Sequence, residues 1–245
     1  MNFTTQNTLA EIVKADYRAA RVFEKYNLDF CCNGNRTVFS AASEKKLDPD
    51  SILNEVRVIL GTIVQKDSGQ KTITEELPLN ELVAHIINTH HVYLRNIMPF
   101  IYTHSRKVKD VHGKNHPEVI KVAEIFEQIQ DELNSHMMKE ELMLFPFIEK
   151  MAEAGKLGKK IESAPFGSIQ NPISVMEREH TGAGEGLYAI RELTNNYAAP
   201  EDACSTYKVL YKELEEFETD LHRHIHLENN ILFPKAIEME KRVIV

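Results

Sequence analysis

The chain has 245 residues, 42% of them hydrophobic and 27% charged, which is the balance of a globular protein with a sizeable core. Its formal net charge of −8 argues against nucleic acid as a partner, because phosphate binding needs a basic surface. No apolar run reaches the roughly 20 residues that span a bilayer, and the polar N-terminus does not resemble a signal peptide. Three cysteines are too few for a disulfide framework, so the sequence predicts a cytoplasmic protein with no membrane partner.

Residues 1–65 are predicted to form a small helical domain. Apolar residues recur at helical spacing in its first part, at Leu9, Ile12, Val13, Ala20, Val22 and Phe23. A further helix is predicted from about residue 50, with Asp50 or Ser51 as its cap. Residues 66–77 are polar and contain a glycine, so this segment is predicted to be a linker.

Two adjacent cysteines, Cys31 and Cys32, lie between these helical patterns, and Asn33-Gly34 after them indicates a turn. A disulfide between neighbouring residues would be strained and easily reduced. The turn and the nearby Arg36 favour exposed thiols of lowered pKa, which would suit redox exchange or iron transfer. The alternative is a pair of half-buried small apolar residues. The third cysteine, Cys204, is expected to be structural.

Residues 78–245 are predicted to form an antiparallel four-helix bundle, which makes the chain all-α. Its helical patterns cover approximately residues 79–110, 117–151, 172–196 and 201–238. No segment shows the sustained alternation of a β-strand. Pro234 is expected to kink the fourth helix or to end its regular part.

One pattern occurs twice in this region with every offset preserved. His136-x-x-x-Glu140 precedes Leu144-Phe145-Pro146, and His224-x-x-x-Glu228 precedes Leu232-Phe233-Pro234. A histidine and a glutamate four residues apart lie on one face of an α-helix. A single pair of this kind is most often a solvated surface pair. The repetition, with the same apolar tail, instead indicates two helices that offer ligands to a shared metal site.

Two further histidines complete a set at one level of the bundle. In an antiparallel pair of helices, residues equally far from the connecting turn lie at the same height. His91 and His136 are equally far from the first predicted turn, and His180 and His224 are equally far from the last. The predicted ligands are therefore His91, His136, Glu140, His180, His224 and Glu228. His112 lies at the first turn itself, too far along a regular helix to join them.

Four imidazoles and two carboxylates favour a pair of transition-metal ions, because calcium and magnesium prefer oxygen and structural zinc prefers closed four-ligand sites. Iron is the first choice and manganese the second. Bridging carboxylates would leave positions open for water, an oxo bridge, oxygen or nitric oxide. Glu132, one turn before His136, and Glu179, next to His180, are candidates for hydrogen bonds to the ligands or for an ion path, although a surface role fits Glu179 equally well.

A glycine-rich segment, 181–186, follows His180 within the third helical pattern. Each glycine there costs about 1 kcal/mol of helix stability relative to alanine. Two explanations stay open at this point: a close approach between helices, or a channel for small molecules with local mobility.

Four blocks of the sequence closely resemble the Repair of Iron Centers proteins, which are di-iron proteins with a hemerythrin-like bundle. The blocks are Asp29–Gly34, His136–Glu141, Ser174–His180 and His224–Pro234. The resemblance covers nearly the whole chain and implies two iron ions per chain, bridged by oxo and carboxylate groups. The six predicted ligands match the family's iron ligands. His112 also matches a family histidine, which keeps it open as a further ligand or functional residue.

The resemblance further implies a stress protein that repairs iron–sulfur clusters damaged by nitrosative or oxidative stress, by donating iron to iron–sulfur client proteins. Cys31 and Cys32 would receive the iron or dock on a client. A nitric oxide reductase, or a sensor that binds nitric oxide or oxygen, is an alternative at the same site. A reversible oxygen carrier is disfavoured, because the third helix offers one histidine where hemerythrin has two. A homodimer is compatible with the sequence.

Overall fold

The computed structural model describes residues 3–61 and 77–245, which form helices and contain no β-strand. The all-α prediction is confirmed. No helix in these two ranges is both long and apolar enough to cross a bilayer. The predicted linker, 66–77, lies outside the described residues except for Leu77, so the domain boundaries stay a prediction.

Contacts between Cα atoms divide the chain into two units. The first contains Met1–Pro78 together with Ile225–Lys235, and the second contains Leu79–His224 together with Ala236–Val245. The segment Ile225–Lys235 therefore belongs to the first unit by its contacts, although the sequence prediction assigned it to the bundle domain.

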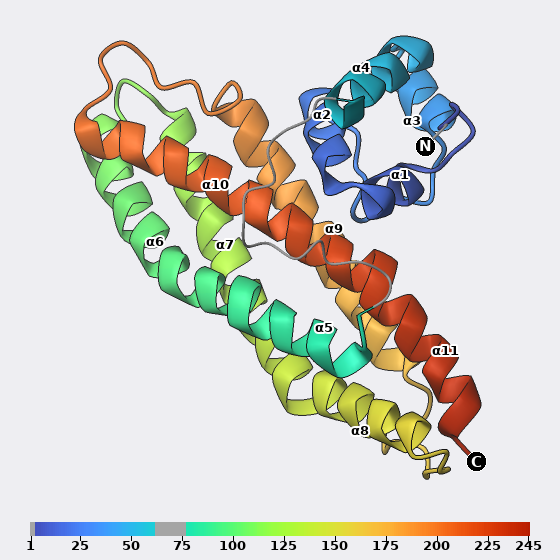
Figure 1. Ribbon diagram of the computed structural model, residues 1–245. Coiled ribbons are helices and arrows are strands. Elements are labelled where there is room, and N and C mark those ends of the chain that lie inside the picture. The colour runs from blue at the N-terminus through green and yellow to red at the C-terminus, as the bar shows by residue number, and fades with distance from the viewer. Residues whose placement is uncertain (1–2, 62–76) are drawn as a thin grey trace. The chain divides into compact units, whose positions relative to one another are not determined.

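Within residues 3–61, the first unit contains four short α-helices, α1 (Leu9–Ala15), α2 (Ala20–Lys25), α3 (Val38–Glu44) and α4 (Pro49–Gly61), and a 3₁₀ turn at Tyr17–Ala19 (Figure 1). Helix α1 begins with a capping box, in which the Thr8 hydroxyl accepts from the Glu11 N–H and the Glu11 carboxylate accepts from the Thr8 N–H. The predicted apolar stripe is buried throughout. Helix α4 is capped by Asp48, whose carboxylate accepts the Ser51 N–H at 3.2 Å, so the predicted cap at Asp50 or Ser51 is wrong.

Within the first unit, the segment Ile225–Lys235 contacts the loop that carries the adjacent cysteines. The side-chain amides of Asn229 and Asn230 donate hydrogen bonds to the Cys31 carbonyl at 3.3 and 3.2 Å. The His226 ring lies beside Tyr17 and Phe30, with ring centroids 5.9 and 6.0 Å apart. These contacts hold the cysteine loop against the two residues that follow Glu228.

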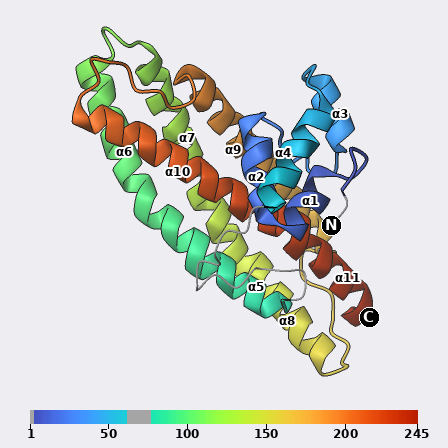
Figure 2. The ribbon, with the colours of Figure 1, turned by 45° about the horizontal axis from the view of Figure 1, so that its top comes forward.

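Four long helical runs form the bundle, and except for residues 225–235 they belong to the second unit. They are α5 (Leu79–His85) continued by α6 (Val92–His112), α7 (Glu118–Lys139) continued by α8 (Phe145–Lys156), α9 (Gln170–Leu193), and α10 (Ser205–Leu227) continued by α11 (Phe233–Val243). Figures 1 and 2 show α6, α7, α9 and α10 lying side by side.

Helix α7 packs against both α6 and α9. Hydrogen bonds from His104 to Glu213 and from Arg191 to Glu218 join α10 to α6 and to α9, which closes the ring of four. Phe126 of α7 and Phe217 of α10 meet edge to face across the core, with centroids 5.4 Å apart. The predicted four-helix bundle is confirmed.

Three of these four runs contain a π-helical turn, a wider turn that is frequent at functional sites. The turns are Ile86–His91, Glu140–Leu144 and Glu228–Leu232, and each contains one of the predicted ligands. Pro146 and Pro234 stand second in the α-helix that follows a π turn. Proline cannot donate to the carbonyl four residues back and its ring clashes there, so the helix changes its hydrogen-bond pattern just before it. The regular part of α10 accordingly ends at Leu227, as predicted from Pro234.

Two glycines in the glycine-rich segment of α9, Gly182 and Gly186, differ in how closely other side chains approach them. A Cβ atom on Gly186 would lie 2.9 Å from Cδ1 and 3.1 Å from Cγ1 of Ile129 on α7. A Cβ atom on Gly182 would meet no atom within 4 Å. Close helix approach therefore explains Gly186, whereas nothing in the packing explains Gly182.

This contrast predicts different effects of two alanine substitutions. Gly182→Ala is expected to raise the free energy of unfolding by about 1 kcal/mol, because it gains helix propensity at no steric cost. Gly186→Ala gains the same propensity but crowds Ile129, so its net effect is expected to be smaller or opposite in sign. Urea denaturation of both variants measures the difference. An equal or larger stabilisation by Gly186→Ala would contradict the close approach.

Candidate metal centre

The six predicted ligands lie together as two groups in which every ligand atom is within 4.8 Å of the others. One group is His91, Glu140, His224 and Glu228, and the other is His136, Glu140, His180 and Glu228. The exposed fraction of each of the six residues is 1% or less. Both glutamates belong to both groups, which is the arrangement of a site for two ions that share carboxylates.

Glu140 belongs to both groups and lies between their histidines. Its Oε2 atom is 3.4 Å from Nε2 of His91 and 3.4 Å from Nε2 of His136. The histidines also approach one another in pairs: Nε2 of His91 is 3.2 Å from Nε2 of His224, and Nε2 of His136 is 3.0 Å from Nε2 of His180. The Nε2 atoms thus converge on the shared carboxylate from two sides.

The outer nitrogen of His91 is held by a carboxylate. Its Nδ1–H donates to Oε1 of Glu141 at 2.7 Å, and Arg95 donates to the same oxygen at 2.8 Å. Burial acts to raise the pKa of Glu141, but the hydrogen bonds from Arg95 and His91 outweigh it and hold the pKa below its usual value. The ionised carboxylate fixes the ring and its tautomer, which leaves the Nε2 lone pair available to a metal.

His136 has the same arrangement with a partner from another helix. Its Nδ1–H donates to Glu179 of α9 at 2.9 Å, and Lys139 forms a short ion pair with the same carboxylate. The hydrogen bond from His136 contributes most to lowering the pKa of Glu179 to about 2, against the opposing effect of burial, and Lys139 lowers it further. Glu179 therefore forms a hydrogen bond with a predicted ligand, which is one of the two roles that the sequence left open for it.

These contacts test whether the residues fit a metal. Donation of both Nδ1 protons leaves lone pairs on Nε2 of His91 and His136, and each lone pair faces another ring nitrogen and a carboxylate oxygen. Such a convergence of electron pairs is stabilised by a cation. Imidazole nitrogen and carboxylate oxygen together suit iron. The two groups fit a di-iron site.

Glu141 and His90 belong to this site although neither stood among its predicted residues. Glu141 adjoins Glu140 inside the π turn, and its adjacency to a predicted ligand is the signal that could have identified it. His90 is buried, its ring stacks on His224 at a centroid distance of 5.6 Å, and its Nδ1 atom lies 3.0 Å from Asp220.

Two predicted residues lie elsewhere. Glu132 is exposed and takes part in no hydrogen bond or ion pair found among residues 3–61 and 77–245. It is therefore not brought to a ligand, although it lies one helical turn before His136 on α7. His112 ends α6 and contacts Cys204, with 3.2 Å between Nε2 and Sγ.

The cysteine pair in the first unit differs from expectation. Cys31 is buried and Cys32 is half-buried, with 3.9 Å between their sulfur atoms, so the prediction of two exposed thiols is wrong. The hydrogen bond with Cys32, together with burial and the nearby Asp29, raises the pKa of Cys31 well above its usual value. One Asp29 oxygen accepts the N–H groups of Cys31 and Cys32, and its carboxylate groups with both sulfurs within 4.8 Å.

Comparison with protein families gives two matches. The family model of the hemerythrin HHE cation binding domain matches residues 82–236, which include all six grouped ligands. A domain of unknown function (DUF542) matches residues 5–59.

Similar proteins extend over almost the full chain. The iron–sulfur cluster repair protein YtfE of Cronobacter sakazakii is 40% identical over 234 residues, 95% of this chain and 97% of that protein. The protein of the same name from Citrobacter koseri is 38% identical over 241 residues, 98% and 100% of the two chains. That of Escherichia fergusonii is 38% identical over 233 residues, 95% and 97%. Two helical units, a buried His/Glu cluster and this similarity identify the chain as a member of the Repair of Iron Centers family of hemerythrin-like proteins.

Proposed function

We propose that the protein repairs iron–sulfur clusters damaged by nitrosative or oxidative stress, by donating iron to iron–sulfur client proteins in the cytoplasm. Two iron ions per chain, bridged by oxo and carboxylate groups, would be bound by His91, His136, Glu140, His180, His224 and Glu228. The names of the similar proteins, all iron–sulfur cluster repair proteins, support this assignment.

The observation that carries the proposal is the sharing of Glu140 and Glu228 between the two groups of ligands. Each ion would have only two imidazoles of its own and would depend otherwise on shared carboxylates. Reduction lowers the charge of the ion and so weakens its attraction to the carboxylates, and ferrous iron lies near the weak end of the divalent affinity series, so reduction would favour release from such a site. This donor set suits a protein that gives its iron away.

A second cluster supports a path for the iron. Asp29, Cys31 and Cys32 offer one carboxylate and two sulfurs within 4.8 Å, a donor set with affinity for iron. The hydrogen bond with Cys32 and burial raise the pKa of Cys31. A cation bound at this cluster would favour the thiolate form and so lower that pKa. Asn229 and Asn230 hold the Cys31 carbonyl and directly follow the candidate ligand Glu228. Cys31 and Cys32 are therefore proposed to receive iron and pass it to the client.

Cluster assembly on a client tests the donation. Iron-loaded protein is mixed with an apo iron–sulfur protein, a sulfide source and a reductant, and the cluster is followed by its visible absorption. Assembly is expected to be faster and more complete than with free iron at the same concentration. Equal assembly in the two mixtures would contradict donation.

The cysteine pair is tested in the same assay. Replacing both Cys31 and Cys32 by serine is expected to slow the transfer while leaving the iron content unchanged, because the His/Glu groups contain no cysteine. Cys204→Ser is the matched control and is expected to transfer iron at the wild-type rate. Wild-type transfer by the double variant would remove these cysteines from the path.

A further inference from the structure

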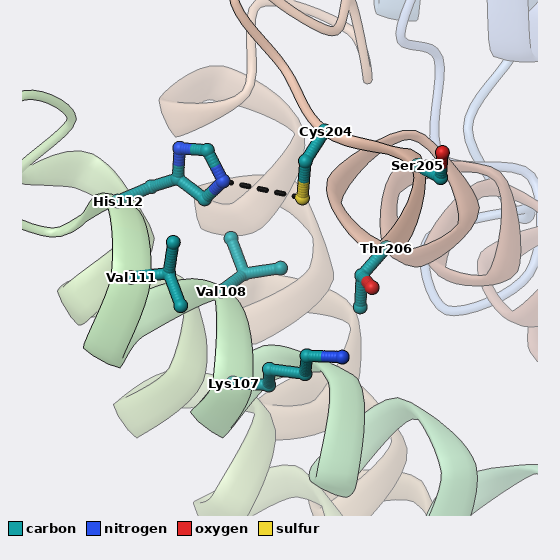
Figure 3. A pocket seen from close by; sticks show the side chains of 7 residues that line it. All are labelled: Lys107, Val108, Val111, His112, Cys204, Ser205 and Thr206. Atoms are coloured by element: carbon teal, nitrogen blue, oxygen red, sulfur yellow. Dashed lines mark hydrogen bonds between the residues drawn. The ribbon is translucent and has the colours of Figure 1, made fainter.

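A cavity of about 320 Å³ lies in the second unit between the end of α6 and the beginning of α10 (Figure 3). Its walls are formed by Lys107, Val108, Val111 and His112 of α6 and by Cys204, Ser205 and Thr206. The volume lies at the lower end of the range of small-molecule sites, about 300–1,000 Å³. None of these residues belongs to the metal centre.

The wall of this cavity contains a thiol paired with an imidazole. Cys204 is exposed, and its sulfur lies within hydrogen-bond distance of Nε2 of His112, at 3.2 Å, as the dashed line in Figure 3 shows. The His112 ring is positioned by Tyr207, whose centroid is 5.2 Å away. An accessible thiol next to a base that can take its proton is the arrangement of an activated cysteine nucleophile. The exposure of Cys204 and its contact with His112 do not fit the sequence-based expectation that this cysteine is structural.

Cys204 also lies at one end of a long helix. The Cys204 carbonyl accepts the Lys208 N–H at 3.1 Å, which places Cys204 at the N-terminus of the 23-residue helix α10. Negative charge is stabilised at such an end, where the backbone N–H groups and the helix dipole point towards it. The Asp202 carboxylate, two residues earlier, is bound to Nε2 of His116 at 3.0 Å, which offsets its repulsion.

The other lining residues indicate what kind of reagent fits. Lys107 brings an ammonium group to the cavity and would pair with a carboxylate. Val108 and Val111 provide an apolar wall for a short carbon chain. A small molecule with carboxylates and a reactive sulfur matches this combination.

We propose that Cys204 and His112 form a site of covalent modification by a carboxylate-bearing, low-molecular-weight disulfide. As the Cys204 sulfur attacks one sulfur of the reagent, His112 Nε2 takes the thiol proton. The disulfide bond of the reagent breaks as a new one forms to Cys204, and the departing thiolate receives the proton from His112. Cys204 is oxidised, one half of the reagent is reduced to a thiol, and no further oxidant is needed.

Oxidised glutathione is the probe for a test on the full-length protein. Adducts are counted by intact mass spectrometry and located by peptide mapping during the reaction. Cys204 is expected to be the first residue modified, because Cys31 is buried and its pKa is raised. His112→Gln is expected to slow modification of Cys204 by about tenfold, since it removes the base that takes the proton.

Recognition of the carboxylate is tested with a second reagent. Lys107→Ala is expected to slow the reaction with oxidised glutathione but not with the uncharged 2-hydroxyethyl disulfide. Lys121→Ala, an exposed lysine outside the cavity, is the matched control and should leave both rates unchanged. Circular dichroism verifies that each variant is folded.

Two results would overturn the proposal. If Cys204 reacted no faster in the folded protein than in urea-unfolded chain, or at the same rate with His112→Gln, the pair would have no activating role. If Lys107→Ala reacted at the wild-type rate with oxidised glutathione, the cavity would not recognise carboxylates.

Discussion

Replacement of both Glu140 and Glu228 by alanine is expected to abolish iron binding. The two carboxylates belong to both groups of ligands, so their loss removes half of the donor atoms of each group at once. They are also the only negatively charged residues in either group, and four neutral imidazoles alone would not offset the charge of two cations. Iron content per chain, measured by a colorimetric assay and by the absorption spectrum after reconstitution, tests this result.

The controls separate iron binding from folding. The double variant Glu140→Gln, Glu228→Gln keeps the volume of both side chains and is expected to lose iron as well, with helix content unchanged by circular dichroism. Glu132→Ala removes an exposed carboxylate from the same helical run and is expected to keep its iron. Full iron content in the double glutamine variant would contradict the site.

The second large effect is expected from the two carboxylates that hold the outer nitrogens of His91 and His136. Glu141→Ala and Glu179→Ala should each weaken iron binding by about 10- to 100-fold, because the histidine loses the partner that fixes its ring and tautomer. Competition with a chelator of known affinity measures the loss. The glutamine variants should recover part of it, since an amide oxygen still accepts the Nδ1–H.

Glu177→Ala is the matched control for Glu179→Ala. It removes an exposed glutamate two residues away on α9 and is expected to leave iron affinity unchanged. Equal affinities for Glu177→Ala and Glu179→Ala would show that the Glu179 carboxylate has no part in orienting His136.

The sequence predicted much of the metal centre because a bundle has simple geometry. Antiparallel helices of regular rise bring residues equally far from a turn to one height, so the levels of His91, His136, His180 and His224 could be calculated from the turns alone. The repeated His-x-x-x-Glu pattern supplied the two carboxylates in the same way. The structure brings all six together, as that calculation requires.

The residues around the ligands could not be found by the same reasoning. A π turn adds a residue to the helix and rotates every side chain after it, so regular helical spacing fails from Glu140 onwards. That rotation accompanies the contact between Glu141 and His91 on another helix, which a regular pattern does not predict. Glu132 lies one turn before His136 on the regular helix α7, yet its side chain is exposed, so helical spacing alone does not decide which residues reach the ligands.

Contacts between segments distant in sequence could likewise not be predicted from the sequence. The pairing of His112 with Cys204 joins residues on two helices, and nothing near either residue indicates its partner. The burial of Cys31 depends on the packing of its loop within the first unit, whereas the neighbouring Asn33-Gly34 turn suggested exposure.

The amino-acid sequence by itself therefore determined the helices, their antiparallel order, the family and the set of residues that converge, because these depend on periodicity, turns and motifs that are local in the chain. Tertiary structure alone decided which nitrogen of each histidine faces the centre, which carboxylates orient His91 and His136, and which cysteine is accessible. These features depend on side chains from different helices meeting at a few ångströms, and such distances are set by packing and not by sequence spacing.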